Sequence, residues 1–194
     1  MITLLILTVG AAALCWWIAA AILFSLLLFN INFFRDPERQ LPEGEGLFIC
    51  PADGKVIRAD GDEHGSRVDI FMNVFNVHVN RAPMAGRITH MKYIPGKFVN
   101  ASFDHASEEN ERNRFEMETD SGEKIAFTQI SGLVARRIVA YSAVGDQVKA
   151  GQRIGMIRFG SRVNCEIPAD FELNVKAGDH VTAGETIIAR KVQQ

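Results

Sequence analysis

The chain has 194 residues, which is enough for one domain with a hydrophobic core and an appendage, and it carries a formal net charge of −2. This charge argues against nucleic-acid binding, which usually needs a basic patch. The three cysteines form no CxxC pair, and the five histidines form no HxxxH or HExxH motif. We therefore predict a reducing compartment and no metal site.

Residues 1–34 contain no Asp, Glu, Lys, Arg or His. About 20 apolar residues suffice to cross a bilayer, and 34 residues in one helix would be about 50 Å long. The segment is therefore predicted to be a membrane anchor, either one transmembrane helix or a short hairpin that folds back at Gly10 or near Trp16. The first charges begin at Arg35, and the positive-inside rule places that end in the cytoplasm.

Residues 35–194 read as one domain of short strands separated by turns. The predicted strand regions are rich in β-branched and aromatic residues, and they are "LFICPADGKVIRAD" (47–60), "RVDIFMNVFNVHVNRAP" (67–83), "GRITHMKYIPG" (86–96) and "KIAFTQISG" (124–132). Apolar residues at near-helical spacing predict a helix over 133–142. The charged segment 106–120 is predicted to be a loop that leads into a strand.

An internal repeat follows at a spacing of 33 residues, with "VGDQVKAGQRIGMI" (144–157) aligned on "AGDHVTAGETIIAR" (177–190). The pattern resembles the hammerhead units of lipoyl and biotinyl carrier domains, although the carrier lysine is absent. The fold class predicted is mainly β with minor α. It would be a barrel-sandwich or lipoyl-like β domain, preceded by the N-terminal transmembrane helix or helical hairpin.

Gly160 and Ser161 lie between the two repeats, inside a run that otherwise reads as a strand. A bulge or tight turn is the ordinary explanation for such a glycine. A serine after a strained peptide can also attack the preceding carbonyl, given a base and donors for the oxyanion. β-Elimination from the resulting ester would turn residue 161 into dehydroalanine, and hydrolysis of the dehydroalanine would leave a pyruvoyl group there. Such a group accepts electrons as pyridoxal does.

Six segments then match phosphatidylserine decarboxylases in their short bacterial or archaeal form, which the chain resembles. They are, in order, "FFRDPER" (33–39), "PADGKV" (51–56), "FMNVFNVHVNRAP" (71–83), "PGKFVNASFDHASEENERN" (95–113), "QISGLVARRIV" (129–139) and "IRFGSRV" (157–163). The resemblance implies a proenzyme that cleaves itself between Gly160 and Ser161. The products would be a membrane-linked β chain (1–160) and a small α chain (161–194) with the pyruvoyl cofactor, which forms a Schiff base with phosphatidylserine.

The resemblance also implies roles for three residues. Ser161 becomes the pyruvoyl group, Asp53 helps to activate the serine, and His78 donates the proton to the substrate carbon after CO₂ leaves. Longer members have a second histidine where this chain has Arg81, and an arginine is not a base at neutral pH. The base for self-cleavage is therefore open between Asp53, acting through water, and His78, serving both steps.

Two arginines are candidate substrate-binding residues. Arg81 could bind the substrate carboxylate or phosphate bidentately. Arg137, together with its neighbour Arg136, could meet phosphates or anionic headgroups, although adjacent arginines are more often a solvated face. His105 stands where the family pattern would have a lysine, with no consequence that we can derive.

Two other functions stay open from the sequence. The lipid could be archaetidylserine, with ether-linked tails, because no motif reads the tails. The chain could also be a non-catalytic lipoyl-like membrane adaptor, which would explain the anchor and the repeat. The expected partners are a phospholipid in the membrane and a second copy in a homodimer. The expected location is the cell membrane, with the catalytic domain in the cytoplasm.

Overall fold

A computed structural model describes residues 1–103, 106–133, 137–158 and 160–192. The chain divides into two compact units, Met1–Pro37 and Glu38–Gln194. This division lies three residues from the predicted boundary between anchor and domain.

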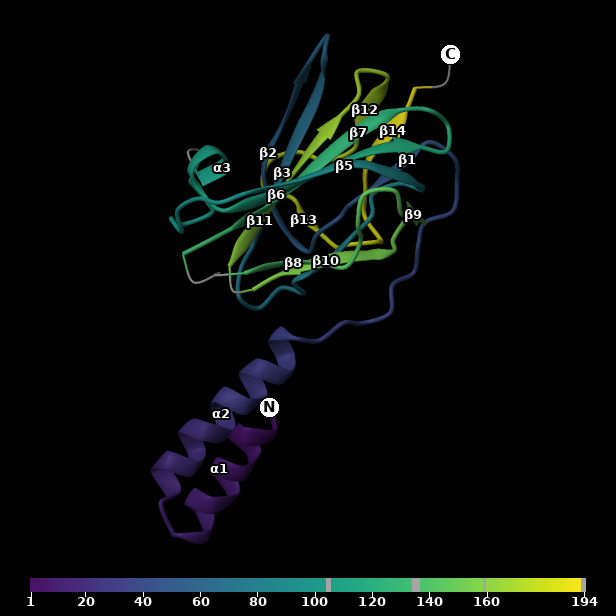
Figure 1. Ribbon diagram of the computed structural model, residues 1–194. Helices are drawn as coiled ribbons and strands as arrows, with labels where there is room; N and C mark the ends of the chain where they lie inside the picture. The colour runs from purple at the N-terminus through teal and green to yellow at the C-terminus, as the bar shows by residue number, and fades with distance from the viewer. Residues whose placement is uncertain (104–105, 134–136, 159, 193–194) are drawn as a thin grey trace. The chain divides into compact units, whose positions relative to one another are not determined.

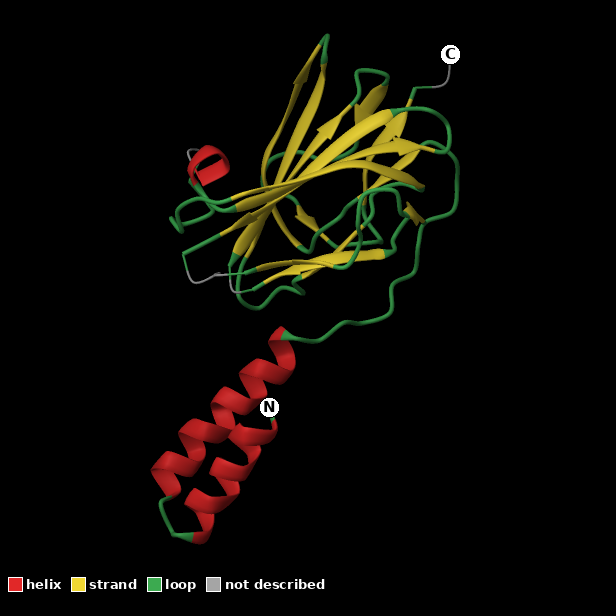
Figure 2. Cartoon of the chain, viewed as in Figure 1, coloured by secondary structure: helices red, strands yellow, loops and turns green. Residues whose placement is uncertain are grey.

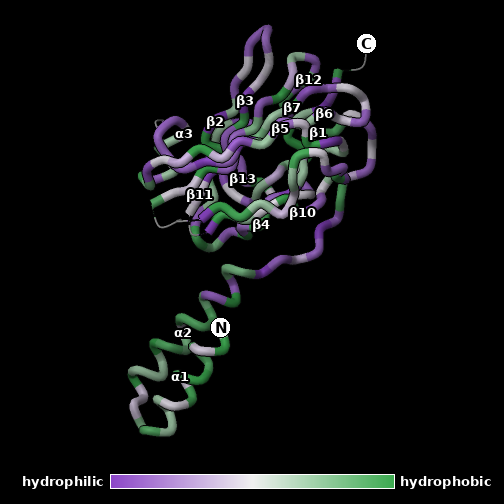
Figure 3. The backbone as a smooth tube through the Cα atoms, viewed as in Figure 1, coloured by the Kyte–Doolittle hydropathy of each residue, from purple (hydrophilic) through white to green (hydrophobic). Residues whose placement is uncertain are grey.

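The first unit is a hairpin of two helices, α1 (Ile2–Ala13) and α2 (Trp17–Phe33) (Figure 1). The chain turns between them at Cys15, whose φ is +57°, a value that ends a right-handed helix. The hairpin alternative is therefore confirmed, and the alternative of one long helix is wrong. Both helices are hydrophobic along most of their length (Figure 3). In the part of the chain that the structure describes, no helix has both the length and the apolarity needed to cross a membrane.

The second unit is built almost entirely of antiparallel strands (Figure 2). The largest sheet has eight strands in the order β13 (His180–Val181), β2 (Gly54–Asp62), β3 (Gly65–Met72), β11 (Ser161–Ile167), β7 (Lys124–Ser131), β6 (Arg112–Thr119), β5 (Gly86–Ile94) and β9 (Gln147–Val148). One small sheet has the order β1 (Leu47–Ile49), β14 (Ile187–Lys191) and β12 (Phe171–Leu173). The other has the order β4 (Val79–Arg81), β10 (Arg153–Ile157) and β8 (Ile138–Ala140).

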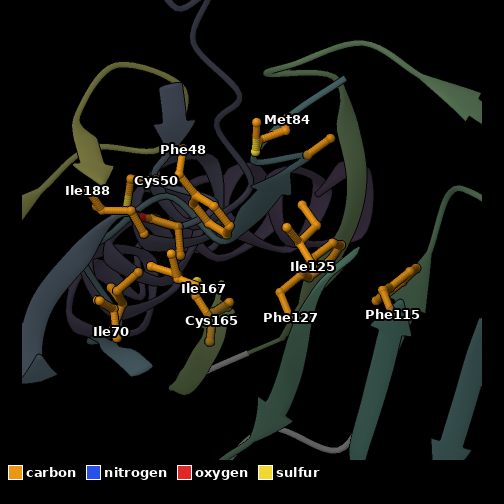
Figure 4. Packing of buried hydrophobic residues seen from close by; sticks show 14 of the residues in the cluster. Phe48, Cys50, Ile70, Met84, Phe115, Ile125, Phe127, Cys165, Ile167 and Ile188 are labelled. Atoms are coloured by element: carbon orange, nitrogen blue, oxygen red, sulfur yellow. The ribbon is translucent and has the colours of Figure 1, made fainter. Parts of the chain in front are cut away.

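The core of this unit is formed by all three sheets (Figure 4). Strand β6 shows why the strands form, because buried residues alternate along it with more exposed ones, as expected for a sheet with one face on a core. Phe115 of β6 stacks on its cross-strand partner Phe127 of β7, with ring centroids 4.9 Å apart. Such aromatic pairs fix the register between neighbouring strands.

The internal repeat is a structural repeat. In each copy a two-residue strand, β9 or β13, precedes a turn at a glycine with positive φ, +72° at Gly151 and +79° at Gly184. A five-residue strand, β10 or β14, follows each turn. The prediction of a mainly β fold with two similar half-units is thus confirmed.

The structure corrects two predicted elements. Within the predicted helix 133–142, residues 134–136 lie outside the described residues, and Ile138–Ala140 is a strand. The β-branched Ile138 pairs with Ile157 of β10, and this pairing overrides the apolar spacing that favoured a helix. The predicted loop at 106–120 instead holds one helical turn, α3 (Ala106–Glu109), and then the whole of β6.

The run that contains Gly160 and Ser161 is two strands of different sheets. Strand β10 ends at Ile157 in a small sheet, and β11 begins at Ser161 in the large one. The chain therefore crosses from one sheet to the other immediately before the serine.

Candidate active site

Ser161 opens β11, an interior strand of the large sheet, and its side chain is fully buried. It pairs with Met72 of β3 on one side and with Ser131 of β7 on the other. Its hydroxyl donates a hydrogen bond to Sδ of Met72 at 3.3 Å. The sheet thus holds the hydroxyl in one place, directly after the peptide bond that the sequence singled out.

Gly160 has a φ of +69°, in the left-handed region that side chains other than glycine rarely adopt. Nothing lies within 4 Å of where its Cβ would be, so glycine is required there for conformation and not for space. Its carbonyl oxygen lies against the α-carbon of Gly132. Gly160 is therefore constrained twice, by its own left-handed backbone conformation and by the close approach of its carbonyl oxygen to Gly132.

Two buried amide side chains, those of Asn80 and Gln129, are linked to Ser161 through Sδ of Met72. Asn80 donates from Nδ2 to Sδ of Met72 at 3.7 Å, and Gln129 donates from Nε2 to Oδ1 of Asn80 at 2.8 Å. All three side chains are fully buried. Sequence reasoning gave these residues no role, although they lie inside the segments 71–83 and 129–139 that carry the family resemblance.

His78 lies beside the chain that leads to the candidate scissile bond. Its backbone carbonyl accepts a hydrogen bond from the N–H of Ile157 at 3.3 Å, and its side chain is buried. Nδ1 of the ring lies 2.9 Å from the carbonyl oxygen of Asn76. Because a carbonyl oxygen only accepts, Nδ1 carries a proton in this arrangement. Nε2 is then the ring atom that can take or give a proton.

Asp53 is held by groups other than the serine. Its carboxylate accepts from Nη2 of Arg39 at 2.9 Å to each oxygen, and from the N–H of Ala183 at 2.8 Å. Ala183 follows β13, which pairs with the edge of β2 away from β3. Two strand spacings, about 10 Å, separate Gly54 of β2 from Ser161 across the sheet. The role of Asp53 in activating the serine stays a prediction.

Arg81 is buried in the same neighbourhood as Asp53. Its Nη1 donates to the carbonyl oxygen of Gly151 at 3.0 Å, and its side chain packs with that of Arg39 against Gly184. Its contacts are therefore with the turns of both repeats. The role of Arg81 in binding substrate stays a prediction.

Arg137 is exposed, and its carbonyl oxygen accepts a hydrogen bond from the N–H of Arg158 at 3.2 Å. It therefore lies beside the segment that leads to Gly160, and its role in binding substrate stays a prediction. Arg136 and His105, which the sequence also singled out, lie outside the described residues.

Two buried thiols do not compete with Ser161 as nucleophiles. Burial raises the pKa of Cys50 to about 12, and burial also raises the pKa of Cys165 well above its usual value. Both thiols stay protonated at neutral pH, and a protonated thiol is a poor nucleophile.

The fold and the site define a mainly β protein with a buried serine at the point where the chain passes from one sheet to another. The family model of phosphatidylserine decarboxylase matches residues 26–189, which is most of the chain. The chain belongs to this family.

Three relatives, each named phosphatidylserine decarboxylase proenzyme, are similar along nearly their whole length. The protein of Syntrophus aciditrophicus (strain SB) is 51% identical over 177 residues, 88% of this chain and 83% of the relative. That of Nitratidesulfovibrio vulgaris is 48% identical over 190 residues, 95% of this chain and 88% of the relative. That of Symbiobacterium thermophilum is 47% identical over 184 residues, 91% of this chain and 86% of the relative.

Proposed function

We propose that this protein is a self-processing decarboxylase that converts phosphatidylserine to phosphatidylethanolamine and CO₂, the activity that gives its family its name. The observation that carries the proposal is the position of Ser161. It is buried on an interior strand directly after a left-handed glycine, and its hydroxyl is held on Met72. Such a placement serves a nucleophile for the preceding peptide bond.

The precursor is proposed to divide between Gly160 and Ser161 into chains 1–160 and 161–194. A pyruvoyl group made from Ser161 supplies the carbonyl that accepts the electrons released with CO₂. This group fits the site, because it is no larger than the serine that already occupies the buried position beside Met72 and Ser131. The flanking strands hold the first residue of the small chain in place after cleavage.

His78 is proposed to hold the working proton at Nε2. Its Nδ1 is fixed on the carbonyl of Asn76, and its backbone is bonded to Ile157, near the scissile bond. Asp53 is already engaged with Arg39 and the N–H of Ala183. This difference favours His78 as the group that serves both self-cleavage and protonation of the product.

The two arginines are proposed to differ in role. Arg137 is exposed beside the scissile segment and is free to approach a lipid phosphate from solvent. Arg81 is buried and bonded to the carbonyl of Gly151. Its contacts support a role in holding the two repeats together around Asp53, and binding of the substrate carboxylate is the alternative.

Membrane association is proposed to involve the loops at the serine end of the sheet. Phe75 follows β3, Leu133 follows β7, and Phe103 lies in the loop whose carbonyl contacts Arg162. Their side chains are 68%, 66% and 52% exposed. Apolar side chains grouped on exposed loops mark a surface for a membrane or another apolar partner. A lipid whose tails stay in the bilayer would reach the serine from this end.

The cytoplasmic orientation and the homodimer remain proposals. Protease protection in sealed inverted and right-side-out vesicles tests the orientation. Light scattering of the detergent-solubilised protein, corrected for bound detergent, tests the dimer.

The direct test of the proposed function compares Ser161→Ala with Ser131→Ala. Both serines are buried on the same rung of the sheet, so the second variant is a matched control. Ser161→Ala should remain one chain and produce no CO₂ from phosphatidylserine, while Ser131→Ala should be cleaved and active. A parent protein that stays one chain and inactive would favour the adaptor. Parallel assays with diacyl and ether-linked lipids decide between phosphatidylserine and archaetidylserine.

A further inference from the structure

We propose that Gly132 is a positioning residue for self-cleavage, because the absence of a side chain at position 132 leaves the space that the carbonyl oxygen of Gly160 occupies. The inference rests on the proposed cleavage between Gly160 and Ser161. It concerns a residue that touches the scissile peptide from the neighbouring strand.

The register of the sheet brings the two glycines together. Ser161 of β11 pairs with Ser131 of β7 in an antiparallel ladder, so Gly160 and Gly132 face each other one position further on. A Cβ on Gly132 would lie 2.3 Å from the carbonyl oxygen of Gly160 and 3.0 Å from its carbonyl carbon. It would also lie 3.3 Å from Cβ of Ala101, a buried residue. Real Cβ atoms do not approach an oxygen so closely, so an alanine at 132 must change the distance between its own strand and the carbonyl of Gly160.

The two glycines are required for different reasons. Gly160 has a positive φ and open space around it, whereas Gly132 is not among the described glycines with positive φ and is tightly surrounded. Backbone conformation therefore explains glycine at position 160 but not at position 132. The close approach of the carbonyl of Gly160 explains why position 132 is a glycine.

The carbonyl orientation matters for the bond that forms. Oγ of Ser161 bonds to the carbonyl carbon of Gly160, the carbonyl oxygen takes the negative charge, and the hydroxyl proton passes to the base. Collapse of this intermediate breaks the C–N bond, and the amine of residue 161 takes up a proton, which leaves an ester. Because Gly132 fixes where the oxygen lies, it fixes the face of the carbonyl that the hydroxyl meets. A misplacement of about 1 Å at a reacting centre can cost a hundredfold in rate.

The alternative is that Gly132 only allows two strands to pack. Gly86 of β5 separates the two possibilities, because a Cβ there would lie 2.3 Å from the carbonyl oxygen of Glu118 and 2.7 Å from Cα of Thr119, a clash at least as severe. Gly86 also has no positive φ in the structure, and two strands, β7 and β6, separate β5 from β11 in the sheet. Gly86→Ala thus introduces the same kind of crowding away from the serine.

The experiment follows cleavage of full-length Gly132→Ala, Gly86→Ala and parent by intact mass after pulse labelling. We expect Gly132→Ala to cleave at least about a hundredfold more slowly than the parent. Gly86→Ala should cleave within about threefold of it, a difference of less than one kcal/mol in the barrier. Hydroxylamine, which cuts esters, should not detectably cut the Gly132→Ala precursor after residue 160, because the ester would form too slowly to accumulate.

Several results would overturn the inference. They are cleavage of Gly132→Ala at the rate of Gly86→Ala, and a hydroxylamine-labile ester that accumulates in Gly132→Ala. Unfolding of both variants is measured separately in the uncleavable Ser161→Ala background. A Gly132→Ala protein that unfolds at a far lower temperature than Gly86→Ala would show that position 132 serves the fold. A parent that is not cut after residue 160 would overturn the proposed cleavage itself, whereas a cut parent with a normally cut Gly132→Ala overturns this inference alone.

Discussion

Arg162, the second residue after the candidate scissile bond, forms a buried ion pair with Asp69 of β3. Its guanidinium also donates to Oδ1 of Asn164 at 2.7 Å and to the carbonyl oxygen of Phe103 at 3.2 Å. Cleavage would make Arg162 the second residue of the small chain. The pair would then fix the register of that chain's first residues on β3.

Breaking this pair from one side should strongly destabilise the protein. We expect Arg162→Met to lower the free energy of unfolding of the Ser161→Ala precursor by about 1.5–3 kcal/mol, because the buried carboxylate of Asp69 would lose one of its two arginines and keep only its ion pair with Arg67. Urea unfolding, followed by circular dichroism, measures this change in the free energy of unfolding. The double variant Arg162→Met, Asp69→Leu should recover most of the loss, and a single variant that loses under about 1 kcal/mol would contradict the buried pairing.

The base for self-cleavage can be assigned by two variants. We expect His78→Ala to remain one chain, because Nε2 of His78 is the proposed proton acceptor. Asp53→Asn should still be cleaved, although more slowly, because an amide oxygen can accept from Arg39 and Ala183 in place of the carboxylate. Time-resolved gels of the newly made proteins measure both rates.

The opposite pattern would assign the base differently. A cleaved His78→Ala together with an uncleaved Asp53→Asn would make Asp53 the activating group, acting through water. If His78→Ala is cleaved, its kcat should still fall by about 10²–10⁴, the usual contribution of a general acid.

Glu123, in the turn before β7, should make the stability of the protein depend on pH in the acid range. Burial alone would raise the pKa of Glu123, but hydrogen bonds from Lys191, Ser121 and Thr119 outweigh it and lower the pKa to about 2. The folded state therefore gains stability from the ionised carboxylate above its ordinary pKa of 4.5. This stability is lost as the pH falls from about 4.5 to about 2.

Glu123→Gln tests this contribution. In the Ser161→Ala precursor at pH 7 we expect a loss of about 1 kcal/mol, or 2–4 °C in melting temperature, because Lys191 is partly exposed to solvent. The difference from the parent should vanish near pH 2. Glu118→Gln, at an exposed position of β6, should change the melting temperature little at either pH. A Glu123→Gln deficit that is equal at both pH values would contradict the ionic origin.

The exposed apolar side chains at the end of the sheet where Ser161 lies should make activity depend on a lipid surface. Phe75→Ser combined with Leu133→Ser should lower activity on phosphatidylserine vesicles at least about tenfold, since each buried apolar side chain contributes roughly 1.5–3 kcal/mol. Activity on short-chain phosphatidylserine below its micelle concentration should change little. Tyr93→Ser, another exposed large side chain, is the control. Equal losses on both substrates would argue for a folding or catalytic defect.

The sequence predicted the strands well where pattern and tertiary pairing agree. The β-branched segments around Ile70 and Phe127 are strands, and the glycine turns of the repeat have the conformation that their spacing implied. The segment at Ile138 failed because apolar spacing does not reveal that β10 lies beside it. Local pattern cannot report a partner strand that is distant in sequence.

The site was predicted in part for the same reason. Motifs singled out Ser161, Gly160 and His78 as candidates, and in the structure they lie along the crossing between β10 and β11, while their roles stay predictions. Gly132 and Asn80 were not given a role, because their importance comes from cross-strand approach and not from residue type. Asp53 was found, but its ion pair with Arg39 depends on a contact that the sequence does not show.

The central claim is that Ser161 cuts its own chain and becomes the reactive group. Intact mass spectrometry of active, purified protein tests it most directly. We expect two chains, with the fragment 161–194 lighter by one ammonia than the same peptide beginning with serine. An active preparation that consists of the uncut chain, or of a small fragment with an ordinary serine at position 161, would contradict it.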